Sequence, residues 1–141
     1  MALTQINNGD SGLIARGKIN TAFTTVDNLP LPSSATVQTT NGATTSIASI
    51  SLGTYSVNSI EASLSAYDTT NALAYGSQLF GVFKKSGGTT SQVGTTDVYE
   101  KTGFSTATSH IHVSGGNAVI YVIGEASKTI NWTVNYSVTK I

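Results

Sequence analysis

The chain of 141 residues contains no cysteine, only two prolines and few charged side chains. Without cysteine, neither a disulfide framework nor a thiolate metal site can form. Lysine, arginine, aspartate and glutamate together make up 10% of the residues, against roughly 25% in ordinary soluble domains. The formal net charge is zero, and Lys84-Lys85 is the only adjacent basic pair. A patch that neutralises phosphates is therefore not expected, and nucleic acid is excluded as a partner.

Long hydrophobic runs and a leader are also missing. No apolar run approaches the roughly 20 residues that a membrane-spanning helix needs, so no membrane partner is expected. Residues Met1–Thr4 lack the charged and apolar regions of a secretory signal. A chain with little charge, no thiol and no export signal, yet with the composition of an extracellular β-module, can fold in a reducing cytosol and persist outside the cell.

What the chain has in abundance is serine and threonine, which together number 40, and threonine favours strands. Apolar and polar residues alternate from Ile60 to Ala66 and again from Ile130 to Val138, as in half-buried strands. Residues 78–85 and 118–123 are apolar on both faces, which predicts central strands. The expected strands are 35–40, 43–52, 57–67, 78–85, 89–94, 97–101, 104–114, 118–123 and 129–138. Together they predict an all-β fold, an antiparallel jelly-roll-like β-sandwich over residues 33–141.

Three glycine-containing turns separate these strands. Asn41-Gly42 is a strong two-residue hairpin signal. Ser86-Gly87-Gly88 and the pair Gly115-Gly116 also predict hairpin turns, since glycine supplies the positive φ that such turns need. Each turn should therefore join two strands that pair with each other.

Residues 8–29 carry the one helical pattern of the chain. Apolar residues recur at steps of three and four, so they share one helix face, and the prolines at positions 30 and 32 end the helix. Two interior glycines weaken it, so it needs a surface on which to dock. We expect an N-terminal unit, residues 1–32, made of an arm, one short α-helix and a proline linker. Its anchoring or oligomerisation residues are Leu13, Ala15, Ile19, Ala22, Phe23, Val26 and Leu29. The alternative is that the helix packs on its own β-domain.

Part of this segment also carries a family resemblance. The run Asn8-Gly9-Asp10-Ser11-Gly12-Leu13, followed by Arg16, Lys18-Ile19-Asn20 and Phe23, resembles the N-terminal segment of many tailed-phage fibre and particle-surface proteins. The resemblance covers roughly the first thirty residues. A second, shorter one lies near the C-terminal end, where Gly124, Ala126, Ile130, Asn131 and Trp132 resemble the last hairpin of small phage fibre and head-decoration β-domains.

The resemblance implies a phage virion structural protein, a short head fibre, capsid decoration or tail fibre. Its N-terminus would fasten it to other virion proteins of the capsid or tail, or to its own trimer axis. The stripe Ile19, Ala22, Val26 and Leu29 also favours a homotrimer. Two heptads cannot hold a trimer alone, so the β-domains should contribute to the interface.

The pair His110 and His112 is the sharpest candidate for a metal site. On a strand the two side chains point to one face, about 6–7 Å apart. Three chains around a threefold axis would present six imidazoles, which suits an octahedral transition metal, and H-x-H motifs of this kind occur in trimeric phage fibres that hold an axial iron. The alternative is two plain histidines on a polar strand face, with no cofactor. A cupin metalloenzyme is not expected, because no glutamate and no further histidine follow at the required spacing.

No catalytic constellation stands out. The acidic residues are scattered, and no G-x-S-x-G elbow is present, so we expect no enzyme activity. Trp132 lies on the apolar face of an alternating strand, which favours a core anchor over a sugar platform. Tyr67, Tyr75 and Tyr99, if exposed near loops, could stack on sugars. The alternative function is therefore a module that binds host-surface glycan.

Overall fold

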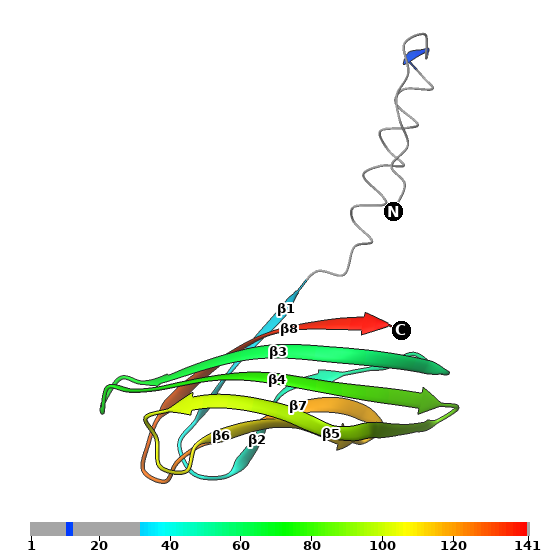
Figure 1. Ribbon diagram of the computed structural model, residues 1–141. Coiled ribbons are helices and arrows are strands. Elements are labelled where there is room, and N and C mark those ends of the chain that lie inside the picture. The colour runs from blue at the N-terminus through cyan, green and yellow to red at the C-terminus, as the bar shows by residue number, and fades with distance from the viewer. Residues whose placement is uncertain (1–10, 13–31, 141) are drawn as a thin grey trace. The chain divides into compact units, whose positions relative to one another are not determined.

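The computed structural model describes residues 11–12 and 32–140, and its strands form two antiparallel sheets (Figure 1). The five-stranded sheet contains, in spatial order, β1 (Ser33–Thr39), β8 (Ile130–Lys140), β3 (Ser56–Asp68), β4 (Leu73–Ser86) and β5 (Thr89–Thr102). The three-stranded sheet contains β2 (Thr44–Ile50), β7 (Asn117–Ile123) and β6 (Thr108–Ser114). The prediction of an all-β, two-sheet sandwich is confirmed. The predicted helix and its anchoring residues from Leu13 to Leu29 lie outside the described residues.

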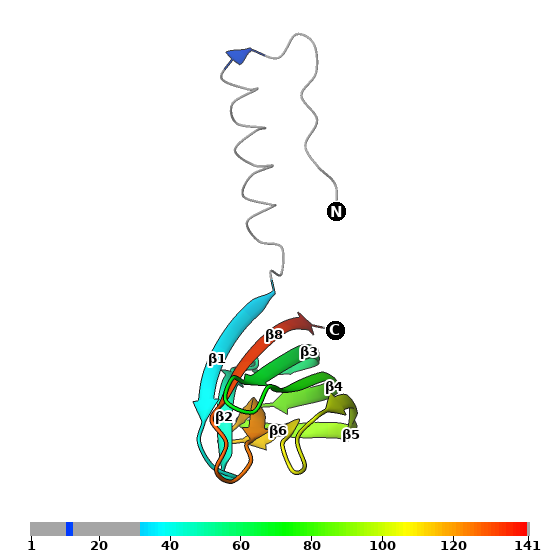
Figure 2. The same ribbon diagram turned by 90° about the vertical axis from the view of Figure 1, so that its left-hand side faces the viewer.

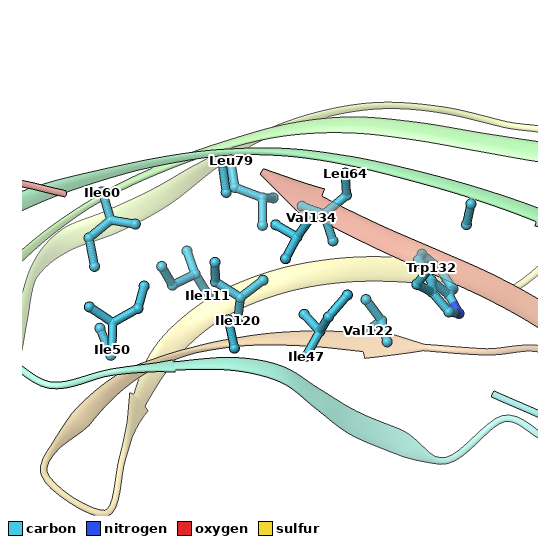
Figure 3. Packing of buried hydrophobic residues seen from close by; sticks show 14 of the residues in the cluster. Ile47, Ile50, Ile60, Leu64, Leu79, Ile111, Ile120, Val122, Trp132 and Val134 are labelled. Carbon is cyan, nitrogen blue, oxygen red and sulfur yellow. The ribbon is translucent and has the colours of Figure 1, made fainter. Parts of the chain in front are cut away.

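The two sheets pack face to face around one hydrophobic core (Figures 2 and 3). The alternation predicted for β3 is confirmed, because Ile60 and Leu64 are buried while Glu61 and Ser65 are exposed. The same holds for β8, where Ile130, Trp132 and Val134 are almost fully buried. From the other sheet, Ile47, Ile50, Ile111, Ile120 and Val122 face these residues across the interior (Figure 3).

The connection through Asn41-Gly42 differs from the prediction. The two strands that it joins do not pair: β1 pairs with β8, and β2 pairs with β7. The predicted hairpin is therefore wrong, and residues 40–43 carry the chain from one sheet to the other. The backbone N–H of Ala43 donates to Asn41 Oδ1 at 2.9 Å, so the Asn-Gly pair does make a turn. Turn chemistry bends the chain locally, but burial of both flanking strands against the core decides which sheet each one joins.

The other two glycine turns are hairpins as predicted. Ser86 pairs with Thr89 across the β4–β5 turn, and Ser114 pairs with Asn117 across the β6–β7 turn. Gly87, Gly115 and Gly116 all have positive φ, which side chains other than glycine rarely adopt. Residues 89–94 and 97–101, expected as separate strands, belong to the single strand β5.

The order of the strands retains only part of a jelly roll. Strands β1, β2, β3 and then β7, β8 alternate between the two sheets. Between them, however, β3, β4 and β5 form a meander within one sheet, and β6–β7 is a simple hairpin. The two Greek keys of a jelly roll are therefore not both present, because the long hairpins keep successive strands in the same sheet.

The junction between β1 and β8 is closed by a buried hydrogen bond. Trp132 Nε1 donates to Thr39 Oγ1 at 2.9 Å, and both residues are buried. The loop after β7 passes close by, and a Cβ at Gly124 would overlap the Asn41 carbonyl oxygen and the Thr39 side chain. Glycine is thus required at position 124 by the close approach of two backbone segments. Trp132 is a core anchor, as its place in the alternating strand predicts.

Candidate functional site

A shallow groove of about 500 Å³ crosses β3, β4 and β5 on the outer face of the five-stranded sheet. It is lined by Glu61, Gln78, Phe80, Asp97 and Tyr99, together with main chain of the two strands β4 and β5. Strand register brings these side chains together. Glu61 pairs with Phe80, and Phe80 pairs in turn with Asp97, so the three form one row across the sheet. Gln78 and Tyr99 pair in the next row.

Two aromatic rings stand open to solvent in this groove. The exposed fraction is 39% for Phe80 and 63% for Tyr99. The two residues are diagonal neighbours on adjacent strands, where side chains lie about 7–8 Å apart. Lys101 Nζ lies 5.5 Å from the centroid of the Tyr99 ring, within the range of a cation–π contact. The groove therefore offers apolar ring surface next to polar groups.

Two carboxylates flank the Phe80 ring. Glu61 lies one strand to one side and Asp97 one strand to the other, so their Cα atoms are about 9.6 Å apart from the spacing of strands. The sequence places no two acidic residues together, and this pair meets only through strand register, because the two are distant in sequence but share one row across the sheet. Among residues 32–140, neither carboxylate has a hydrogen-bond or ion-pair partner.

A bulge in β5 shapes the rim of the groove. Val82 pairs with Val93 while Phe80 pairs with Asp97, so residues 94–96 are inserted opposite Gly81. The first inserted residue, a glycine, has φ of 71°. Within the bulge, Thr96 donates its hydroxyl to the Ile111 carbonyl oxygen at 2.9 Å, which ties β5 to β6. An isolated glycine inside a strand pattern is the sequence signal of such a bulge.

The three tyrosines proposed as sugar contacts are distributed differently from the expectation. Tyr99 lies in the groove, and Tyr67, with an exposed fraction of 46%, lies on the same face outside it. Tyr75 is buried, with an exposed fraction of 4%, so the expectation that it is exposed is wrong. The reason is the alternation of side chains along a strand: Tyr75, Ser77 and Leu79 lie at every second position of β4 and all face inward.

Tyr75 belongs to a chain of hydroxyl groups between the sheets. Its phenol donates to Glu100 Oε2 at 2.6 Å. Since its one proton is used there, the 2.7 Å contact with Ser109 Oγ is donated by Ser109, and Ser77 donates to Ser109 at 2.7 Å. Burial, and then the bond to Glu100, raise the pKa of Tyr75. Every described buried side-chain polar atom has a partner, and these hydroxyl groups connect β4 to β6 across the interior.

His110 and His112 lie on the outer face of β6, on the same side as predicted. Their ring centroids are 5.1 Å apart with planes at 10°, and His112 also stacks on Tyr121 at 4.4 Å. Burial, and then the charge of His112, lower the pKa of His110, so His110 is neutral at pH 7. Near-parallel rings direct their nitrogens side by side rather than at one ion.

Within the described part of the chain, no cluster of three or more His, Cys, Asp or Glu could hold a metal. The threefold-axis metal site needs three chains and stays a prediction. In the same described part, no helix is long and apolar enough to cross a membrane.

Of the groove residues, sequence reasoning singled out only Tyr99. Residues 78–85 were interpreted as apolar on both faces, which is correct for the place of β4 between two strands but wrong for Phe80, which faces solvent. Strict alternation from the buried Leu79 would have placed Gln78 and Phe80 outward. Only strand register shows that Glu61 and Asp97 join them.

No protein-family model and no curated protein matches this sequence. Among solved structures, the tailspike protein of Acinetobacter baumannii phage AM24 is similar with a TM-score of 0.36 and 10% sequence identity. The matched region covers 76% of this chain and 26% of the tailspike chain, so the chain spans about a quarter of that protein.

Proposed function

We propose that this chain is a non-enzymatic structural protein of a phage virion. It is a short head fibre, capsid decoration or tail fibre that its N-terminal segment attaches to capsid or tail proteins. The sandwich is the part displayed. The support comes from the resemblance over residues 8–23 and from the β-sandwich fold, which is compatible with that resemblance.

One structural observation carries the proposal. Among the described residues, the buried core from Ile47 to Val134 is formed by the inner faces of both sheets together with Leu52, Phe104 and Ala107 of the connecting loops, and the buried polar atoms are satisfied. A sandwich that closes its own core needs no further segment for stability. The N-terminal residues can therefore serve attachment rather than folding.

A homotrimer is the proposed oligomeric state, with the β-domain contributing to its interface. Strand β5 supports this role, because it is an edge strand and none of its residues is buried. Val98, on the core-facing side of β5, keeps an exposed fraction of 45%. An apolar side chain at an open sheet edge is a contact point for a neighbouring copy.

Deleting residues 1–29 tests the proposal. The truncated protein should keep the circular-dichroism spectrum of a β-sandwich and unfold cooperatively, while phage grown with the truncated gene should lack this protein on purified particles. The matched control is the full-length double variant Ile19→Asp/Val26→Asp, which keeps the chain length and should be equally absent. If the truncated protein is unfolded, the segment belongs to the sandwich core and the attachment role is wrong.

The alternative function is a glycan-binding module of a tail fibre. A specific observation favours it as an added role of the displayed sandwich, namely the groove that holds Phe80 and Tyr99. Attachment to the particle and recognition of a host surface are compatible in one chain, since they use different residues.

A further inference from the structure

We propose that the groove across β3, β4 and β5 binds a neutral oligosaccharide. Phe80 and Tyr99 contact the sugar rings, and Glu61, Gln78 and Asp97 accept hydrogen bonds from sugar hydroxyls. The inference names a ligand for the displayed sandwich and rests on the proposed function only in placing that sandwich at the particle surface.

The aromatic pair is the first argument. Exposed aromatic rings lose the benefit of burial unless something covers them, and Phe80 and Tyr99 are open at 39% and 63%. A pyranose ring carries an apolar face of C–H groups that packs against an aromatic ring, while its hydroxyls point sideways. Because the two rings are diagonal neighbours on β4 and β5, they can contact adjacent units of one sugar chain.

The polar groups are the second argument. Glu61 and Asp97 carry only acceptor oxygens, and they have no partner among residues 32–140. Gln78 Nε2 donates to Ser63 Oγ at 2.6 Å, which fixes the amide and leaves its carbonyl oxygen toward ligands. Hydrogen bonds to a carboxylate are roughly twice as strong as neutral ones. A ligand rich in hydroxyl donors matches this set of acceptors.

Charge decides which sugars fit. Two carboxylates line the groove, and Lys101 is engaged with the Tyr99 ring, with Nζ 5.5 Å from the ring centroid. An anionic glycan would place its negative charge beside these two carboxylates. The site therefore selects uncharged sugars and disfavours acidic ones.

The shape of the groove sets the size of the ligand. Its volume of about 500 Å³ lies within the range of known ligand sites. It is open along the sheet rather than enclosed, so a chain of sugars can lie across the strands. An open site gives weak affinity for each copy, which several copies on one particle would compensate by avidity.

Binding of the full-length protein to an array of neutral and anionic oligosaccharides tests the inference, with calorimetry on the neutral ligand that binds best. We expect Tyr99→Ala and Phe80→Ala each to weaken binding at least about tenfold. Asp97→Asn and Glu61→Gln should each weaken it several-fold, since a neutral acceptor replaces a carboxylate. The matched control is Tyr67→Ala, a solvent-exposed tyrosine on the same face outside the groove, which should change affinity less than twofold. Thermal unfolding of each variant confirms that it is folded.

Three outcomes would overturn the inference: no neutral oligosaccharide binds, only anionic ones bind, or Tyr67→Ala weakens binding as much as Tyr99→Ala. A change in oligomeric state of Phe80→Ala by light scattering would also overturn it, since the face would then be a contact between copies. Protein that joins particles but binds no sugar would remove this inference and leave the structural function standing. Protein that binds sugar but does not join particles would remove the structural function and leave this inference standing.

Discussion

The outer faces of the five-stranded and three-stranded sheets are built from the same hydroxyl-rich sequence, yet their aromatic residues behave in opposite ways. On the three-stranded sheet, His110, His112 and Tyr121 stack on one another at 4.4–5.5 Å. On the five-stranded sheet, Phe80 and Tyr99 stand apart beside unpaired carboxylates. The faces of stacked rings are covered by neighbouring rings, whereas the faces of separate rings are open to a ligand.

The lengths of the strands explain a second difference. Strands β4 and β5 have 14 residues each, and every strand of the three-stranded sheet has 7. At about 3.3 Å per residue the longer strands span about 46 Å and the shorter ones about 23 Å. Val98 on the core-facing side of β5 is exposed for another reason: β5 is the edge strand of its sheet, whereas Leu79, its partner on β4, is buried.

The largest expected effect lies where the five-stranded sheet contributes its largest core residue. Trp132→Ala should lower the free energy of unfolding by about 3–5 kcal/mol, because a 1% exposed indole is removed and buried Thr39 loses its donor. Urea unfolding followed by circular dichroism measures the change. Tyr121→Ala, on the outer face of the other sheet, is the control and should cost less than about 1 kcal/mol. Equal losses would mean that the outer stack is as important to stability as the core.

A smaller effect is expected for the hydroxyl chain that links the sheets. Ser109→Ala should cost about 1–2 kcal/mol, because Tyr75 loses a donor and Ser77 loses its acceptor in a buried site. Exposed Ser65→Ala on β3 is the control and should stay within about 0.5 kcal/mol. A double-mutant cycle of Ser109→Ala with Tyr75→Phe should show coupling, and strict additivity would contradict the shared chain.

The smallest expected effect is a dependence on pH that arises on the three-stranded sheet. The pKa of His110 is lowered in the folded state, so the unfolded chain binds more protons as pH falls below about 6.5. Stability should therefore be complete above that pH and decline as the pH falls from about 6.5 toward 5. Thermal midpoints over this range measure it, and the variant His110→Gln should flatten the profile.

Asp68 does not interfere with that measurement. The side-chain hydrogen bond from Asn71, helped by backbone donors, lowers the pKa of Asp68. Its contribution to stability is complete above its ordinary pKa of about 3.9 and is lost only below that value.

The same thermal assay also tests the metal site: added Zn²⁺, Ni²⁺ or Fe²⁺ should leave the thermal midpoint unchanged at pH 7. A rise that disappears in His112→Ala, with stoichiometric metal in the purified protein, would instead establish the threefold site.

Local sequence patterns predicted the strands well where one face of the strand is buried and the other is exposed to solvent. The alternation around Ile60 and Ile130 located both strands and their inward sides, because a period of two maps directly onto the faces of a sheet. The Asn41-Gly42 turn failed as a pairing signal, since a turn specifies a bend but not which sheet the next strand joins. The groove could not be predicted, because Glu61, Phe80 and Asp97 meet only through the register of three strands.

The pairing of β1 with β8 has a consequence for biosynthesis. Ser33 lies opposite Tyr136, so the first described strand to leave the ribosome pairs with the last. Contacts of such long sequence separation form slowly, and they cannot form at all on an incomplete chain. The sandwich should therefore close only after β8 has left the ribosome, and until then β1 presents an unpaired edge. Strand β1 has the sequence SSATVQT and contains few large apolar residues. An unpaired strand of this composition has a low tendency to aggregate.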